Sequence, residues 1–493
     1  MRFFYLIIFS FLFSCKPVLK NEPPDLGIID IIFPGDYPDP SILREGEDYY
    51  LTHSSFEHYP GLLIWHSKDL KNWEPVTRAL TKYTGSVYAP DLVKHEGRYF
   101  IYFPGVTAEN GWKVYVISAE KIEGPWSDPV LVGDFWAIDP GFITDQEGTP
   151  FLHLNDGRAI ELERNGLKAK GEVLKVYDGW PIPDEIGVEC FCLESPKLLY
   201  KDGYYHLTSA QGGTAGPSTS HMVVSARSKT PLGPWENSPF NPVVHTWKPE
   251  EPWMSKGHGT IFEGPGGQWY VVYHGYERGF YTLGRQTLME PIEWTEDGWY
   301  KRAIRDTFGL KHLKYDNTRI SSDDFSSEEL HLQWSFFGKN SFQSASLGNG
   351  QLIINSGIGE IKAVHCFVPD HNYSASARIE AEPGVEAGLA AFYNEKYYVG
   401  IASKDGRVFT TRDGRIELEV EAPDAKYFRM IMNHHDLRLQ YSDDGITWKY
   451  LQKAYEVSSY NHNGLGDFLA LKVAMYCTGK GKVAIDDFKY ELQ

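Results

Sequence analysis

The hydrophobic pattern of the first 310 residues is that of short β-strands repeating at a nearly constant interval. Five segments join a turn glycine to an aromatic-rich strand with alternating apolar positions, and they read GEDYYLTHS, GRYFIYFPG, GTPFLHLND, GYYHLTSAQ and GQWYVVYHG. The intervals are 51, 51, 55 and 64 residues, counted between Gly46, Gly97, Gly148, Gly203 and Gly267. Each interval has room for four short strands, so residues 29–310 are predicted to form a five-bladed β-propeller. Five unrelated hairpins in a sandwich are the alternative.

The pattern changes near residue 322, where a second series of alternating strands begins. These strands read QLIIN, AVHCFV, YSASARIE, GLAAFYN, YYVGIAS and RLQYS, and polar turns separate them. Such regular alternation is typical of two packed antiparallel sheets. The chain is therefore expected to be all-β, with a C-terminal β-sandwich of the jelly-roll, concanavalin-like type over residues 322–493.

The N-terminus has the pattern of an export signal. Residues 1–14, MRFFYLIIFSFLFS, place one early arginine before an apolar run that is too short to span a bilayer stably. Leu12 to Cys15 resemble a bacterial lipobox, in which the signal is cut before a lipidated cysteine, although Phe13 is unusual there. We expect a lipid on Cys15, a polar tether over residues 15–28, and a periplasmic or outer-membrane-anchored protein. An ordinary signal peptide that is cut elsewhere is the alternative.

Composition and charge narrow the range of partners. Aromatic residues make up 15% of the chain, which suits the packing of sugar rings, although most aromatic side chains serve as core. The formal net charge of −18 argues against nucleic acid, because phosphate contacts need clustered Lys and Arg. A neutral glycan is therefore a better partner than nucleic acid, and we expect membrane contact only through the lipid.

Four further cysteines match no zinc spacing. Cys190 and Cys192 lie two positions apart, and on a strand two such side chains bridge poorly, so we expect them to be packed thiols. Cys366 and Cys477 both fall in the C-terminal domain, and whether they pair stays open.

A polar residue beside Pro or Gly precedes each of the five turn glycines. The segments are YPDPSIL, YAPDLV, AIDPGFI, LESPKLL and GHGTIFE. Asp39 lies 7 residues before its glycine, Asp91 lies 6, and Asp139, Glu194 and His258 each lie 9. The first strand of a propeller blade lines the central channel, so these side chains are expected to converge near one mouth of it. Crowded carboxylates destabilise a fold unless function needs them, so the cluster indicates an active site.

The acidic residues suit the cleavage of a glycosidic bond, which needs one protonated carboxyl group and one ionised group. Asp39 is held between two prolines, as a rigid general base would be. Glu194 follows an apolar Cys-Phe-Cys-Leu run that should raise its pKa and make it the acid, while Asp139 can hold the proton on Glu194. Asp91 is more simply explained as a structural residue at the start of a strand than as a catalytic one. The competing interpretations are a turn cap for Asp39, an Asx-turn for Asp139, and a pair of Glu194 with Lys197.

Seven motifs together resemble glycoside hydrolase family 43 over nearly the whole chain. They are PGDYPDPSI, LLIWHSKDLKNWE, YAPDL, IDPGF, ESPKLLYKDGYYHLTSAQGGT, GHGTIF and GRQTLMEPIEW. The resemblance implies a five-bladed propeller and an inverting mechanism, with Asp39 as base, Glu194 as acid and Asp139 tuning the acid. It further implies that His258 is a channel histidine and that Arg285 contacts the sugar. The SSFEHYPG loop and the sandwich look most like the β-xylosidase and α-L-arabinofuranosidase branch, which implies xylan or arabinoxylan as substrate.

The chain departs from that branch at two places. Ser195, Pro196 and Lys197 follow the acid where Gly-Pro-His is common, and Tyr88 stands where Trp is usual. The sequence therefore does not define the leaving-group subsite. It also does not distinguish endo from exo action, or a β-1,4-xylosidase from an α-L-arabinofuranosidase. Weaker candidates for the sugar pocket are Phe56, Trp136, Gln211 and Thr214.

Two rival functions compete with this interpretation. A non-catalytic propeller could capture glycans for uptake, and a sialidase would need a tyrosine nucleophile and an arginine cluster, which the acidic channel disfavours. Acid–base hydrolysis requires no cofactor, and no metal-ligand set is predicted. A structural Ca²⁺ is compatible with the acidic turns, but no loop has a calcium-binding spacing.

Overall fold

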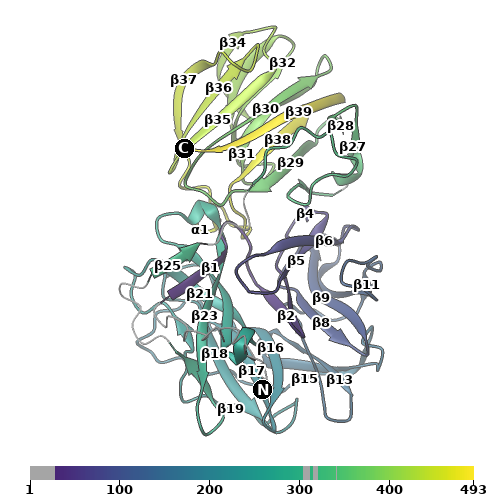
Figure 1. The fold of residues 1–493 in the computed structure, drawn as a ribbon, viewed down its shortest axis with the longest axis vertical. Coiled ribbons are helices and arrows are strands. Elements are labelled where there is room, and N and C mark those ends of the chain that lie inside the picture. Colours follow the sequence, from purple (N-terminus) through teal and green to yellow (C-terminus); the bar gives the residue numbers. More distant parts are fainter. Residues whose placement is uncertain (1–27, 304–310, 315–319, 340) are drawn as a thin grey trace, which may run out of the picture.

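The computed structural model describes residues 28–303, 311–314, 320–339 and 341–493. Figure 1 shows two bodies along the long axis, a propeller built by the N-terminal part of the chain and a sandwich built by the C-terminal part. The predicted signal peptide, Cys15 and the tether up to residue 27 lie outside the described residues. Within the ranges that are described, no helix is long and apolar enough to cross a membrane.

Five antiparallel sheets form the blades and confirm the predicted propeller. From the centre outward, the blades are β2 (Ser41–Glu45), β3 (Asp48–Thr52), β5 (Gly61–Ser67) and β6 (Glu74–Leu80); β8 (Asp91–His95), β9 (Arg98–Thr107), β10 (Gly111–Ala119) and β11 (Val130–Leu131); β12 (Gly141–Thr144), β13 (Pro150–Leu154), β14 (Arg158–Leu162) and β15 (Ala169–Lys175); β16 (Glu194–Lys201), β17 (Tyr204–Gln211), β18 (Met222–Ser228) and β19 (Glu236–Asn237); and β21 (Trp253–Glu263), β22 (Trp269–Glu277) and β23 (Arg285–Trp294). Shorter strands at the blade edges are β7 (Ser86–Val87), β20 (Val244–His245) and β24 (Tyr300–Arg302).

The five turn glycines each join the two innermost strands of a blade, as predicted. All five have positive φ, for example 80° at Gly97 and 78° at Gly203. Glu96 and Asp202, which precede these two glycines, also have positive φ, at 45° and 50°. Left-handed backbone at both central positions is the requirement of a tight type I′ hairpin, which explains the glycine in these two blades. In the other three blades the glycine also has positive φ, a conformation that suits a residue without a Cβ.

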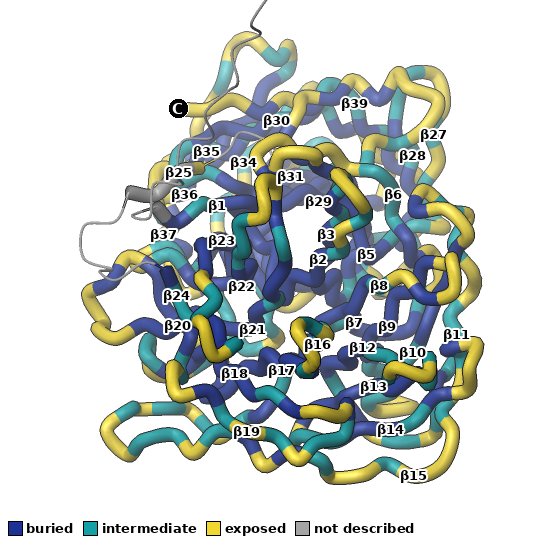
Figure 2. The backbone as a smooth tube through the Cα atoms, turned by 60° about the horizontal axis from the view of Figure 1, so that its bottom comes forward, coloured by how far each residue is buried: buried dark blue, intermediate teal, exposed yellow. Residues whose placement is uncertain are grey.

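The innermost strands form a closed ring, in which β2, β8, β12, β16 and β21 each contact the next and β21 returns to β2. Figure 2 shows the blade strands around this centre mostly buried, while the exposed stretches lie mainly on the turns between strands. The N-terminal strand β1 (Ile28–Phe33) completes the last blade, because it pairs antiparallel with β23 and parallel with β25 (Lys311–Lys314). The two ends of the propeller segment are thereby held in one sheet.

The C-terminal domain is a sandwich of an eight-stranded and a seven-stranded sheet, which confirms the predicted class. The first sheet contains β34 (Arg415–Glu421), β33 (Arg407–Arg412), β32 (Tyr398–Lys404), β31 (Glu386–Phe392), β38 (Lys472–Thr478), β29 (Ile361–Phe367), β26 (Ser335–Phe337) and β4 (His58–Tyr59). The second contains β27 (Ala345–Gly348), β28 (Gln351–Ser356), β39 (Gly481–Leu492), β30 (Asn372–Ala381), β35 (Tyr427–Asn433), β36 (Asp436–Ser442) and β37 (Lys449–Glu456). Strand β4 comes from the first blade, so backbone pairing joins the two domains.

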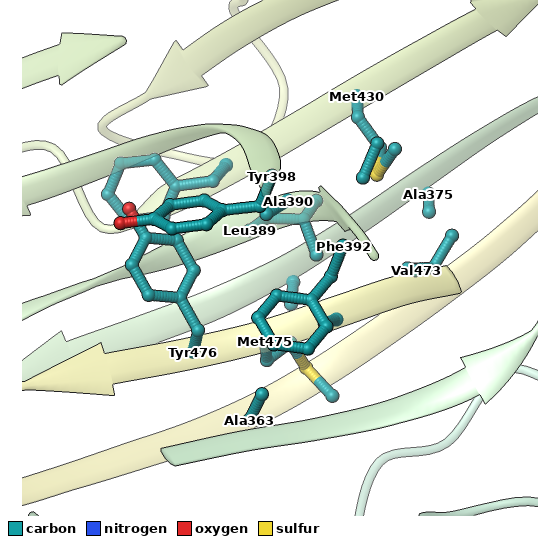
Figure 3. Packing of buried hydrophobic residues seen from close by; sticks show 14 of the residues in the cluster. Ala363, Ala375, Leu389, Ala390, Phe392, Tyr398, Met430, Val473, Met475 and Tyr476 are labelled. Atoms are coloured by element: carbon teal, nitrogen blue, oxygen red, sulfur yellow. The ribbon is translucent and has the colours of Figure 1, made fainter. Parts of the chain in front are cut away.

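The core of the sandwich alternates small and large side chains between its sheets. Figure 3 shows Phe392 and Met475 packed among alanines, with Met430 reaching in from the facing sheet, and all of these side chains are buried. Such interdigitation is how close-packed interiors avoid voids.

The short helices of the described residues are α1 (His462–Leu465), η1 (Asn155–Gly157), η2 (Pro265–Gly267), η3 (Tyr281–Leu283) and η4 (Phe342–Ser344).

The prediction for Cys190 and Cys192 was wrong, because the two residues form a disulfide. They do not lie on a strand but in the loop before β16, where Cys192 adopts φ 37° and the Cα atoms are 5.3 Å apart. This turn of the backbone brings together side chains that an extended chain would hold apart. Cys366 and Cys477 are buried free thiols. They lie on paired strands but out of register, since Cys366 faces Val473.

Candidate active site

A strained backbone conformation marks the entrance of the inner strands. Asp39, Asp139 and Ser195 each precede a proline and have φ of 60°, 53° and 55°, and His258 has φ 55° at the corresponding place in blade five. Left-handed backbone in a non-glycine residue costs about 1–3 kcal/mol and is retained mainly where function requires it. The repetition of this conformation in four blades locates the candidate site at one end of the channel.

Asp39 is buried among an arginine, two histidines and a serine hydroxyl. Its Oδ1 is 3.0 Å from Arg285 Nη1, 3.0 Å from His274 Nδ1 and 3.4 Å from His258 Nδ1, and Ser54 donates to Oδ2. Burial alone would raise the pKa of Asp39, but Arg285 and the two histidines outweigh it and hold that pKa well below its usual value. Asp39 is therefore ionised at neutral pH.

Glu194 and Asp139 also lie beside His258, whose Nδ1 is 3.9 Å from Asp139 Oδ2 and 3.4 Å from Asp39 Oδ1. One carboxylate oxygen of Asp139, one of Glu194 and one ring nitrogen of His258 lie within 4.8 Å of one another. Asp139 Oδ2 also accepts a hydrogen bond from Ser195 N at 3.1 Å. Burial, followed by the neighbouring Asp139 and Asp39, raises the pKa of Glu194 well above its usual value. Burial and Asp39 raise the pKa of Asp139 to about 7. The surroundings of Glu194 thus favour its protonated form, whereas those of Asp39 favour its ionised form.

Asp36, which the sequence analysis did not select, binds the backbone of Arg285. Asp36 is buried and accepts a hydrogen bond from Arg285 N at 3.2 Å. Gly284, with φ 78°, lies between them, and a Cβ there would come within 2.3 Å of Asp36 Oδ1. Asp36 lies in the PGDYPDPSI motif, but its role could not be assigned from the sequence, since its contact with Arg285 spans 249 positions of the chain.

The sandwich contributes a wall of the site. Phe468, in the loop between α1 and β38, lies 5.2 Å from the Arg285 guanidinium carbon, and its ring stacks on His462 at 3.7 Å. Tyr88 contacts both Phe468 and Phe56 edge-on, with ring centroids 6.4 and 5.2 Å apart. The loop therefore adds an aromatic surface beside the arginine, and this role of the sandwich was not predicted.

The weaker pocket candidates divide into three groups. Phe56 is fully buried beside Arg285, at 5.9 Å, and the Thr214 hydroxyl lies 3.4 Å from His274 Nε2, so both adjoin the site. Gln211 bonds the backbone N and O of Trp180 and supports a loop. Trp136 is 51% exposed and lies under Arg158, so it belongs to the surface before β12.

Asp91 does not converge with the other four residues, contrary to the expectation from the repeat. It lies on β8 itself, where Lys197 Nζ donates to its Oδ1 at 2.8 Å. The alternative pairing of Glu194 with Lys197 is therefore wrong. Asp91 also accepts from the backbone N of Phe142 at 2.8 Å, which fits the predicted role at a strand entrance. Its shorter distance from the turn glycine places it further along the strand than Asp39.

The described residues bring together two sets of groups that a cation could approach, Asp39, His258 and His274, and Asp139, Glu194 and His258. Arg285 already supplies the positive charge at Asp39, and a protonated Glu194 is a poor cation ligand. The arrangement instead suits proton transfer between carboxyl groups and a substrate, for which no cofactor is required.

Two domain families match the chain. Residues 30–300 match the family described as glycosyl hydrolases family 43. Residues 322–491 match the one described as the beta xylosidase C-terminal concanavalin A-like domain. The boundary between the two matches coincides with the passage from the propeller strands to the sandwich strands in Figure 1.

Characterised relatives and solved structures align over almost the full length. The Xylan 1,3-beta-xylosidase of a Vibrio species is 29% identical, over 93% of this chain and 98% of its own length. The Non-reducing end alpha-L-arabinofuranosidase of Bacteroides ovatus is 29% identical, over 92% of this chain and 91% of its own. The crystal structure of a GH43 protein from Bacillus licheniformis has a TM-score of 0.82 at 27% identity, with 94% of this chain and 99% of that chain covered. The xylan beta-1,4-xylosidase of Bacillus halodurans has a TM-score of 0.81 at 26% identity, with 93% and 99% covered.

A five-bladed propeller with carboxyl groups of opposite ionisation in its channel defines the class of propeller glycoside hydrolases. The sandwich that walls the site is the second domain of this arrangement. The chain belongs to glycosyl hydrolase family 43 and is an O-glycosyl hydrolase.

Proposed function

We propose that the protein is an inverting glycosidase that releases a pentose, xylose or arabinose, from xylan or arabinoxylan. The observation that carries the mechanism is the opposite ionisation of Asp39 and Glu194 within one cluster around His258. The full-length relatives are named as a xylosidase and an arabinofuranosidase, which supports a pentose as the sugar.

In the proposed reaction, Asp39 removes a proton from a water molecule that attacks the anomeric carbon. Glu194 protonates the departing glycosidic oxygen from the opposite side, so the bond to the leaving group breaks as the bond to water forms. An inverting mechanism needs a gap of about 6.5–9.5 Å between the two carboxyl groups to admit that water. Asp139 keeps the proton on Glu194, because its field opposes ionisation of the acid.

Arg285 and its aromatic neighbours are the proposed sugar-binding wall. The guanidinium is buried against Asp39, and its Nε is buried without a hydrogen-bond partner among the described residues. Phe468, which is only partly buried, offers an apolar face on which the C–H face of a pentose can pack, and Phe56 lies buried beside the arginine. A wall contributed by the sandwich supports the removal of a terminal sugar rather than cleavage within a chain.

The stereochemistry of the product tests this function. Proton NMR recorded in the first minutes of hydrolysis of an aryl β-xyloside and an aryl α-L-arabinofuranoside should show the anomer inverted relative to the substrate. Early product of retained configuration would refute the assignment of Asp39 as base. The ratio of the two rates decides between xylosidase and arabinofuranosidase.

The cellular setting of this enzyme is also a proposal. A lipid on Cys15 behind the signal of residues 1–14 would hold the enzyme at a bacterial outer membrane or in the periplasm, close to imported glycan fragments. Mass spectrometry of the native protein should find the lipid on Cys15, and Cys15→Ser should release the protein from membranes. A structural Ca²⁺ has no part in the reaction, so a chelator should leave turnover unchanged.

A further inference from the structure

A buried ion pair next to the carboxyl cluster has no part in the proposed reaction. Lys197 and Asp91 have only 5% and 8% of their side chains exposed. Lys197 Nζ donates to Asp91 Oδ1 and to the carbonyl of Pro90, both at 2.8 Å. Two charges taken out of water are costly even when they are paired, so the retention of such a pair calls for a reason beyond stability.

This pair ties together the inner strands of four neighbouring blades. Asp91 lies on β8 and receives Lys197 from β16. Its Oδ1 also accepts from the Ser41 hydroxyl of β2 at 3.2 Å, and its Oδ2 accepts from Phe142 N of β12 at 2.8 Å. A single carboxylate therefore sets the relative positions of blades one to four at the level of the channel.

The strands that are tied in this way carry the candidate catalytic groups. Each tied residue follows one of these groups by two or three positions: Ser41 follows Asp39, Phe142 follows Asp139, and Lys197 follows Glu194. The backbones of β12 and β16 are in close contact here, since a Cβ on Gly141 would lie 1.7 Å from Pro196 O. A shift of the ion pair must therefore move the three carboxyl groups relative to one another.

The charge of Lys197 also reaches the site. Burial and Asp39 raise the pKa of Asp139, and Lys197 is the largest influence that lowers it. Lys197 likewise opposes protonation of His258, whose pKa burial already lowers. Among the described residues, the ammonium is thus faced by Asp91 on β8, Asp139 before β12 and His258 on β21, and Ser41 of β2 binds the same Asp91 oxygen.

We propose that Lys197 is a positioning residue of the hydrolysis, which through its ion pair with Asp91 fixes the spacing of the carboxyl groups on blades one, three and four. This inference rests on the proposed function, because it concerns the geometry of the same reaction. Lys197 does not touch the substrate; it acts through the strand that begins at Glu194. A displacement of about 1 Å can cost an enzyme ~100-fold in rate. Loss of an ion pair that holds three strands in position should therefore lower kcat measurably.

The test is the double variant Lys197→Met with Asp91→Asn, which removes both charges and leaves neither one buried alone. We expect kcat to fall about tenfold or more with little change in KM, because the groups that react are displaced while the sugar wall is intact. The alkaline limb of the pH profile should move to lower pH, since loss of the cation favours the protonated form of Asp139, which then holds the proton on Glu194 less strongly. Lys197→Arg should recover much of kcat, and Lys201→Met, on the partly exposed end of the same strand, should match the parent.

A double variant with parental kcat and pH profile would overturn the proposal and leave the pair a purely structural contact. Should the double variant not fold, Asp91→Asn alone is the second test, because the Asn oxygen and the carbonyl of Pro90 can still accept from Lys197 Nζ while the negative charge is lost; kcat should still fall, and parental kcat would overturn the proposal. If the parent hydrolyses no glycoside, it is the proposed function that fails. Infrared titration of the carboxyl bands in parent and variants then still tests Lys197, and identical titrations would count against it.

Discussion

The two sides of the propeller channel shift the pKa of a carboxyl group in opposite directions. On the side of blade five, Asp39 is surrounded by Arg285, His258 and His274 and has a pKa well below its usual value. On the side of blades three and four, Glu194 has burial and other carboxyl groups as its main influences, and its pKa is far above the usual value. Both groups are carboxyls, so the difference comes from their neighbours alone.

The anchoring of the two sides differs as well. The base side is tied to Arg285, which packs against Phe468 of the sandwich and is held by Asp36. The acid side is tied to Asp139 through Ser195 N and to the loop that carries the disulfide. Loss of a base-side group should therefore affect all substrates, whereas loss of an acid-side group should depend on the leaving group.

Replacement of the acid should give the largest separation between the two sides. Glu194→Ala is expected to lose about 10²–10⁴-fold in kcat on xylan fragments, because nothing then protonates the leaving oxygen. An aryl glycoside with an acidic leaving group needs no such proton and should lose much less. Steady-state kinetics on both substrates measures the difference, and Asp39→Asn should lose activity equally on both.

An exposed acid on the preceding loop, Glu185→Ala, is the matched control for a general effect of lost charge. It should leave both substrates at the parental rate. Equal losses on the two substrates for Glu194→Ala would contradict the division between acid side and base side.

Removal of the tuning carboxylate should shift the pH profile rather than abolish activity. In Asp139→Asn, the negative field that raises the pKa of Glu194 is gone, so that pKa falls and the alkaline limb of kcat moves to lower pH. At neutral pH, kcat should drop about tenfold, as less of the acid is protonated. The acidic limb, which reports Asp39, should move less. A profile whose alkaline limb is unmoved, or moves upward, would remove Asp139 from this role.

The contrast between the two sides was only partly readable from the sequence. Periodic turn glycines revealed the five blades, because each hairpin is a local structure with a local signal. Asp39, Asp139 and Glu194 could be selected because each lies at or just before the start of an inner strand, within two positions of a proline. The charges that decide their ionisation were less accessible, since Arg285 reaches Asp39 across 246 positions.

What the sequence could not give lies in contacts between distant elements. Asp91 shares the repeat with the catalytic candidates, yet it is shifted along its strand and pairs with Lys197, and only the three-dimensional register reveals this. Phe468 reaches the site from the other domain through a loop with φ of 68° at Asp467 and 53° at Phe468. Asp and Phe carry no signal for such a turn comparable to that of glycine.

The wall from the sandwich should matter for binding more than for chemistry. Phe468→Ala is expected to raise KM about tenfold, equivalent to ~1.4 kcal/mol, with a smaller change in kcat, because it removes an aromatic face but no proton-transfer group. Tyr450→Ala, an aromatic residue on the sandwich surface with 51% exposure, is the control and should leave KM unchanged. A tenfold fall in kcat at constant KM would place Phe468 with the base instead of with the sugar wall.

The smallest effect is expected from the disulfide on the acid side. Cys190 and Cys192 close a very short loop, and short loops gain little from a cross-link, about 1–2 kcal/mol. Glu194 is held independently by the start of β16, where Ser195 N binds Asp139 and Lys197 binds Asp91. Cys190→Ser with Cys192→Ser should therefore lower Tm slightly and change kcat by no more than about threefold on either substrate, well below the effect of losing the acid itself. A loss on xylan fragments that approaches that of Glu194→Ala, with aryl glycosides spared, would mean that the disulfide loop and not the strand sets the position of the acid.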